Sequence, residues 1–197
     1  MKKGRKALLL AVCALLLVSA SILGTVAYLT DTETVTNTFT VGAVALSLDE
    51  ADVDEYGVID GEDRVQANEY KLIPGRTYVK DPTVHVDPKS ESCWLFVKVD
   101  NEIASVEAAD HTIASQILAN GWTALDGADG VYYKSFDKNA DPKVLDHVVF
   151  TDFTVDGEKT GDDLAALAGK KIHVTAYGIQ LDGFEGNPTG AWEAVSK

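Results

Sequence analysis

The residues that could carry catalytic chemistry are few and far apart in this sequence. The histidines stand singly, and none belongs to an H-E-x-x-H arrangement. That arrangement binds zinc because a spacing of four residues on a helix places both imidazoles on one face. The sequence therefore indicates no zinc peptidase site of the usual kind at any of its four histidines, His85, His111, His147 and His173.

Nucleophilic chemistry has no stronger support. Cys93 lies in the apolar run CWLFVKV, where burial would raise the pKa of the thiol and make it unreactive. The chain has no G-x-S-x-G motif and no glycine-rich phosphate loop. We interpret Cys93 as a small buried hydrophobic residue. We therefore expect no catalytic residues and a protein that is not an enzyme.

An acidic stretch at residues 49–55 is a candidate cation site. Alternating carboxylates in a loop can supply the six to eight oxygens that calcium prefers, which makes Asp49, Asp52 and Asp54 candidate calcium ligands. Their spacing fits no EF-hand loop. A solvated connection between strands is the interpretation we favour, because runs of charge are ordinarily exposed. We therefore expect no cofactor, with calcium as the alternative.

The elements that would position these residues are mostly strands. Apolar residues alternate along residues 41–48, which predicts a first core strand. The run 93–99 is apolar on both faces, as is typical of a central strand covered on both sides. Helical spacing within residues 101–120 predicts one or two short helices that could cover its second face. Further strands are expected near residues 77–87, 122–125, 131–134, 144–155 and 171–181, with a short helix at 162–168 and a tail docked by Trp192.

This pattern favours an antiparallel β-sandwich with one or two short helical insertions, in a single domain over residues 41–197. Cys13 falls within the apolar N-terminal segment, so Cys93 has no partner for a disulfide. The fold must be held by its core, and about 170 residues are enough to form one.

The first 27 residues are typical of an export signal. A basic start is followed by an apolar run over residues 7–23, and Thr25 and Ala27 supply the small residues of a signal-peptidase site before Tyr28. An uncleaved anchor is the alternative, because the uncharged run is long enough to span a bilayer. We favour cleavage. The protein is then secreted, to the extracellular space or the cell-surface matrix, and contacts the membrane only before processing.

Cleavage would leave a strongly acidic protein. Four of the 17 Lys and Arg lie in residues 1–27 with none of the 31 Asp and Glu, so the mature chain would carry 13 − 31 = −18 charges. Nucleic acids and anionic lipids bind to basic patches. The composition therefore argues against nucleic acid as a partner.

The predicted new N-terminus begins with an unusual segment at residues 28–40. Every even position from Thr30 to Thr40 is threonine, which would form one β-branched face of an extended strand. The opposite face begins with Asp31 and Glu33 and ends with Phe39. Fully extended, residues 30–40 would reach about 37 Å, which is long for a strand in a compact domain. The segment could pair within its own subunit, act as a tether, or bind another molecule.

Short motifs along nearly the whole chain carry a family resemblance. They read GTVAYLTD at 24–31, FTVG at 39–42, LSL at 46–48, LIPG at 72–75, CWLFV at 93–97, GW at 121–122, VYY at 131–133 and AYGIQ at 176–180. With these motifs the chain resembles the TasA/camelysin family of exported Firmicutes proteins, whose signal peptides are of the type processed by the SipW signal peptidase.

The resemblance implies a jelly-roll-like domain that polymerises head to tail with itself into biofilm matrix fibres. An accessory matrix protein would be a further candidate partner. Each mature N-terminus would be donated as a strand to the next subunit. The polymerisation strand implied in this sequence consists of Leu29, Thr30, Asp31, Thr32, Glu33, Thr34, Val35, Thr36, Asn37, Thr38 and Phe39.

Two alternatives to a fibre subunit remain open at the level of sequence. The family also contains camelysin-type metalloendopeptidases, although no zinc motif supports that activity here. Bound zinc and casein cleavage would identify such a peptidase. A monomeric cell-surface binding module is the other alternative, and a shift of its melting temperature with calcium would support the calcium-dependent version.

Overall fold

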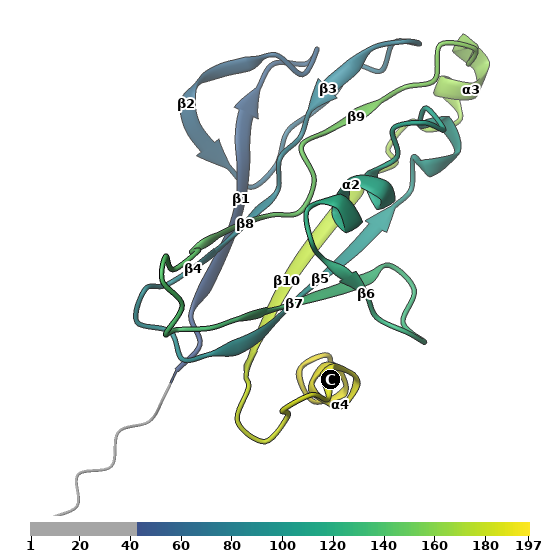
Figure 1. The fold of residues 1–197 in the computed structure, drawn as a ribbon. Coiled ribbons are helices and arrows are strands. Elements are labelled where there is room, and N and C mark those ends of the chain that lie inside the picture. The colour runs from purple at the N-terminus through teal and green to yellow at the C-terminus, as the bar shows by residue number, and fades with distance from the viewer. Residues whose placement is uncertain (1–42) are drawn as a thin grey trace, which may run out of the picture. The chain divides into compact units, whose positions relative to one another are not determined.

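The structure is a computed structural model that describes residues 43–197 (Figure 1). The expected signal peptide, its processing residues and the threonine-rich segment lie outside the described residues. In chain order the elements are β1 (Leu46–Val53), β2 (Ile59–Val65), β3 (Thr77–Val79), β4 (Thr83–Val86), β5 (Cys93–Asn101), the 3₁₀ helix η1 (Ala104–Val106), α2 (Ile113–Ala119), β6 (Thr123–Ala124), β7 (Val131–Phe136), β8 (Asp146–Val148), β9 (Asp152–Thr154), α3 (Gly161–Ala165), β10 (Ile172–Gln180) and α4 (Pro188–Val195).

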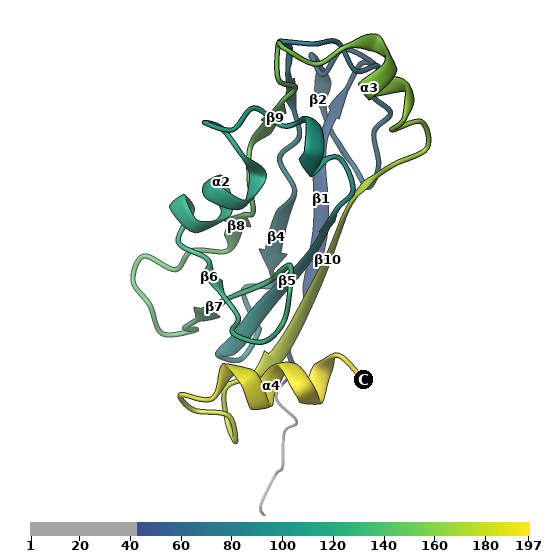
Figure 2. The same ribbon diagram turned by 90° about the vertical axis from the view of Figure 1, so that its right-hand side faces the viewer.

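Two four-stranded antiparallel sheets form a β-sandwich. One sheet has the order β2-β1-β4-β8 and the other has the order β10-β5-β7-β6, while β3 and β9 pair as a separate ribbon. Figure 2 shows the layer of β1 and β4 beside the layer of β5 and β10. The predicted fold class, a mostly β antiparallel sandwich with short helical insertions, is confirmed.

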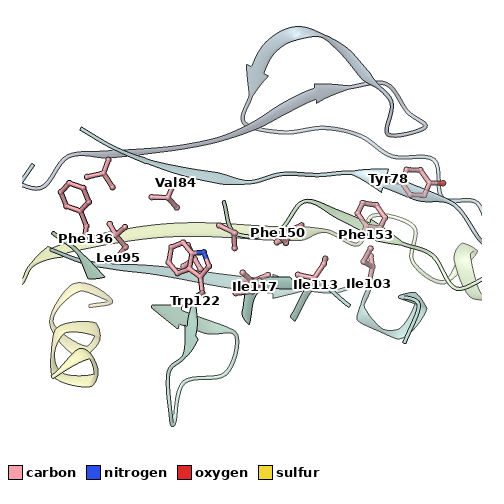
Figure 3. Close-up of a cluster of buried hydrophobic side chains, with 14 of the residues drawn as sticks. Tyr78, Val84, Leu95, Ile103, Ile113, Ile117, Trp122, Phe136, Phe150 and Phe153 are labelled. Carbon is pink, nitrogen blue, oxygen red and sulfur yellow. The ribbon is translucent and has the colours of Figure 1, made fainter. Parts of the chain in front are cut away.

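The core fills the space between the sheets (Figure 3). Val84 of β4 and Leu95 of β5 lie on opposite sides of it, and both are fully buried. The β3-β9 ribbon contributes Tyr78 and Phe153 to this core, and the rings of these two residues stack with centroids 5.0 Å apart. Ile117 from α2 is also fully buried. Burial of these side chains removes apolar surface from water, which is the main source of the stability of the fold.

The central position predicted for the strand at residues 93–99 is confirmed, but the cover predicted for its second face is wrong. β5 lies between β10 and β7, and Phe96 on its second face is fully buried. That face is covered by α4, whose Trp192 lies 5.5 Å from the ring of Phe96 and 5.1 Å from that of Tyr177. α2 packs on the inner core instead. The docking predicted for Trp192 is therefore confirmed.

The first strand begins and ends later than predicted. Side chains alternate between exposed and partly buried over residues 43–48, as expected, but β1 continues through the acidic stretch to Val53. The predicted loop at 49–55 is wrong because β1 pairs with β4 and then with β2, and because Glu50 and Val53 are buried. Pairing with distant strands here overrides the local preference of charged residues for loops.

The helices are short, and side-chain caps lie at the start of α2, α3 and α4. Thr112 caps α2 by accepting a hydrogen bond from the N–H of Ser115. Thr160 and Asp163 form a capping box at the start of α3, which overlaps the helix predicted at 162–168 but begins one residue earlier and ends at Ala165. In the described part of the chain, no helix is both long and apolar enough to cross a membrane.

Candidate functional site: a groove between two open strand edges

Along its first half, one edge of β1 has no neighbouring strand among the described residues. Leu46 to Asp49 pair with β4 on one side, and β2 joins the other side only from Glu50 onward. The N–H of Asp87 donates to the carbonyl of Ala45 at 3.0 Å, so the odd-numbered residues here direct their main chain toward β4. The main-chain N–H and C=O groups of Leu46 and Leu48 therefore point outward, where no other described strand pairs with them.

Within residues 43–197, one edge of β10 is open along its whole length. It pairs with β5 from Ile172 to Gln180, and the order of the sheet places no described strand on its other side. The N–H of Leu181 donates to the carbonyl of Ser92 at 2.9 Å, so the odd-numbered residues of β10 direct their main chain toward β5. The main chain of Ile172, Val174 and Ala176 consequently points away from the sheet.

A groove lies between these two edges. Its volume is about 400 Å³, and its lining from the two strands includes the apolar side chains of Leu46, Leu48, Val174 and Ala176 together with the polar side chains of Ser47, Asp49 and Thr175. These side chains pack against the core but are only partly buried. The groove closes near Gly178, where an added Cβ atom would lie 2.7 Å from the side chain of Leu46.

A second cavity of about 890 Å³ adjoins the first. The two share several lining residues, so they form one continuous depression that extends under α3. The lining of the larger cavity is mixed: it includes the side chains of Tyr70, Phe153 and Leu164 and also several charged residues. The shared lining residues are Glu50, Gln66, Lys80, Ile172 and His173.

A buried polar network lies at the junction of the two cavities. Glu50 is 4% exposed and Lys80 is 9% exposed, and the ammonium of Lys80 forms a salt bridge with Oε2 of Glu50. Nδ2 of Asn68 donates to the other oxygen, Oε1, at 2.8 Å. The ring of Tyr70 lies 6.0 Å from the Lys80 ammonium. Charged groups are rarely buried unless they are paired in this way.

A chain of ion pairs joins all four strands of the β2-β1-β4-β8 sheet. Nε2 of His85 lies 2.9 Å from Asp49, and Nδ1 lies 2.7 Å from Asp146. Arg64 also binds Asp49, and its Nη1 lies 3.0 Å from Asp81. Partial burial lowers the pKa of His85, but its hydrogen bonds to the two carboxylates outweigh burial and raise the pKa overall. Burial raises the pKa of Asp49, and its bonds to Arg64 and His85 lower it overall.

The candidate calcium ligands are engaged differently from one another. Asp49 belongs to the ion pairs just described, whereas Oδ1 of Asp54 accepts hydrogen bonds from the N–H groups of Tyr56 and Val58 at 2.9 Å. Asp52 lies in β1. Among residues 43–197, no group of three or more His, Cys, Asp or Glu is arranged to hold a metal ion.

The remaining candidate residues lie apart from the groove, except for His173, which lines it. His147 is buried, and burial together with the charge of Lys134 lowers its pKa. Nε2 of His111 binds Asp152. Cys93 is fully buried, and burial raises the pKa of its thiol to about 11. The interpretation of Cys93 as a buried hydrophobic residue is therefore confirmed.

The groove itself was not predicted from the sequence. Glu50 and Lys80 are 30 residues apart, so no local sequence motif predicts their contact. The one hint in the sequence is Lys80, a charged residue that directly follows the β-rich residues Thr77, Tyr78 and Val79.

The chain matches no protein-family model, and comparison with curated proteins and with solved structures gives no match. The TasA/camelysin resemblance therefore stays an expectation.

Proposed function

We propose that the protein is a secreted structural subunit of extracellular fibres. Each subunit donates residues 28–40 as a strand to the groove of the next subunit. The observation that carries this proposal is the groove flanked by the outward-facing main chains of Leu46, Leu48, Val174 and Ala176, whose apolar side chains line part of it. Strand addition draws its affinity from such main-chain groups and its specificity from alternate side chains in pockets.

The composition of the two long edge strands supports this use of the groove. Proteins usually protect exposed edges with charges, proline or bulges. β2, an edge strand of the first sheet, carries Asp60, Glu62, Asp63 and Arg64. β10 reads IHVTAYGIQ, without proline or a formally charged side chain. Such an edge would invite aggregation unless another segment covers it.

The donated segment also fits a head-to-tail assembly. A strand that leaves one subunit and enters the groove of another makes a heterologous contact, which need not close into a ring. Residues 30–40 alternate threonine with a second set of side chains, as a strand with two distinct faces would. Repetition of this one contact would give a fibre.

Deletion of residues 28–38 tests the proposal. Electron microscopy of the secreted protein should show filaments, and the deletion variant should remain a folded monomer with an unchanged far-ultraviolet circular dichroism spectrum. The described domain keeps its entire core in this variant, which is why it should fold.

A matched variant controls for changes at the N-terminus. Replacement of each even-numbered threonine from Thr30 to Thr38 by valine keeps the β-branched pattern, so its filaments should persist. Filaments of normal length from the deletion variant would contradict the proposal.

A further inference from the structure

The two ends of the continuous groove differ in chemistry. Toward Gly178 the described lining residues are Leu46, Ser47, Thr175 and Ala176, none of which is charged, and Asp49 lines the groove farther along β1. Toward α3, basic residues gather in a protein with a net charge of −14. The charged and titratable residues that line the α3 end are Glu50, Glu69, Tyr70, Lys80, Lys170, Lys171 and His173.

Lys80 provides hydrogen-bond donors at the α3 end for an incoming hydrogen-bond acceptor. Its ammonium has three N–H donors, and Glu50 is the one side-chain acceptor bonded to it in the described part of the chain. Lys80 borders both cavities, so a group that enters the groove passes beside it. Lys170 bonds to Glu102 at 3.2 Å, and Lys171 is exposed.

Residues 31–39 carry the same asymmetry as the groove. The face opposite the threonines begins with Asp31 and Glu33 and ends with Val35 and Phe39, separated by Asn37. We propose that the donated strand runs parallel to β10 and antiparallel to β1. This inference rests on the proposed function. The two carboxylates of the strand then lie at the α3 end with Lys80, Lys170 and Lys171, and Phe39 lies at the apolar end.

The spacing of the two strands fixes a register. The groove narrows at Gly178, so Phe39 reaches no farther than Ala176. Four residues separate Ala176 from Ile172 and Phe39 from Val35, so Val35 lies beside Ile172. Glu33 then lies beside Lys170. In this register, the charged half of the strand lies in the charged half of the groove.

The opposite direction would place each half of the strand in the wrong surroundings. Asp31 and Glu33 would approach the apolar end, where Leu46 packs over Gly178. Burial of a carboxylate without a partner is strongly unfavourable, so the direction parallel to β10 is favoured.

Zero-length cross-linking tests the direction in assembled filaments. Filaments are grown from an equal mixture of unlabelled and ¹⁵N-labelled secreted protein, and a carbodiimide then joins carboxylates to neighbouring amines. Mass spectrometry should find Asp31 or Glu33 linked to Lys170 or Lys171 of a differently labelled subunit. Links from the same carboxylates to Lys89, Lys138 or Lys143 would overturn the direction, because these lysines surround the turn before β5, at the start of β1.

Charge reversal provides a second readout. The double variant Asp31→Lys/Glu33→Lys should lower the assembled fraction about tenfold or more, because like charges would meet at the α3 end. Adding Lys170→Glu and Lys171→Glu should restore assembly. Assembly of the reversed variant at the normal level would overturn the inference.

The matched control is Glu185→Lys/Glu193→Lys, which makes the same change in net charge at exposed positions near α4. This control should assemble normally, and a loss equal to that of Asp31→Lys/Glu33→Lys would overturn the inference. If the unaltered protein forms no filaments and no links between subunits, the proposed function itself fails. Filaments linked at the other end refute only the direction.

Discussion

At the scale of single residues, two histidines respond to pH in opposite ways because their surroundings differ. His85 lies between two carboxylates, which favour its charged form. His147 is buried, and its Nε2 atom has no hydrogen-bond partner among the described residues. The same side chain therefore stabilises the fold when it is protonated at one site and when it is neutral at the other.

Replacement of His147 by Gln should reduce the decrease in the free energy of unfolding at acidic pH. Burial and the charge of Lys134 lower the pKa of His147 in the folded state below the value of about 6.5 in the unfolded chain. The unfolded state then binds more protons as the pH falls below about 6.5, so the free energy of unfolding decreases there. Urea unfolding at several pH values between 7.5 and 5 should show a smaller decrease in the variant. Parallel curves for the two proteins would contradict this assignment.

Replacement of His85 by Gln should change how the free energy of unfolding varies between pH 6 and pH 8.5. The bonds to Asp49 and Asp146 raise the folded-state pKa of His85 above about 6.5. The stabilisation from protonated His85 is complete below that value and is lost as the pH rises through the raised pKa. The difference in free energy of unfolding between the original protein and the variant should therefore shrink from pH 6 to pH 8.5. A difference that does not change over this range would show that His85 stays neutral.

At the scale of elements, the turn between β1 and β2 depends on close backbone contact. Gly57 has φ = 71°, and a Cβ atom there would lie 2.6 Å from the Cα atom of Tyr78. Gly127 has a similar φ of 79°, but a Cβ atom there would meet nothing within 4 Å. Both positions carry the strain of a left-handed conformation, and only Gly57 adds a clash with the main chain.

Gly57→Ala should therefore destabilise the protein much more than Gly127→Ala. We expect a loss of about 3 kcal/mol or more at Gly57, against about 1 kcal/mol at Gly127. Chemical denaturation of the two variants measures both values. Equal losses would mean that the turn moves away from Tyr78 at little cost.

The elements also show what the sequence could and could not predict. The apolar run at residues 93–99 and the β-rich runs at 131–134 and 171–181 were enough to locate β5, β7 and β10. The extension of β1 was missed because the partners of its acids lie 15 to 36 residues away, as Arg64 and His85 do from Asp49. The cover over Phe96 was misassigned because α4 reaches it from nearly a hundred residues later in the chain.

At the scale of the described domain, the two sheets differ in how their edges are treated. The charges of β2 protect one edge, while β10 and the first half of β1 leave a pair of edges open toward the groove. Sequence patterns predicted the sandwich and the segment that could be donated. The groove that would accept this segment depends on which strands lie at the edges, and strand order is set by long-range pairing that no local pattern encodes.

Amide hydrogen exchange in filaments is the most direct measurement of whether the groove accepts a strand. The amides of Ile172, Val174 and Ala176 point away from β5. They should exchange quickly in the monomer that lacks residues 28–38 and slowly in filaments of the unaltered protein. The odd-numbered amides of β10 should be protected in both. If the even-numbered amides exchange equally fast in filaments and monomer, no strand enters the groove.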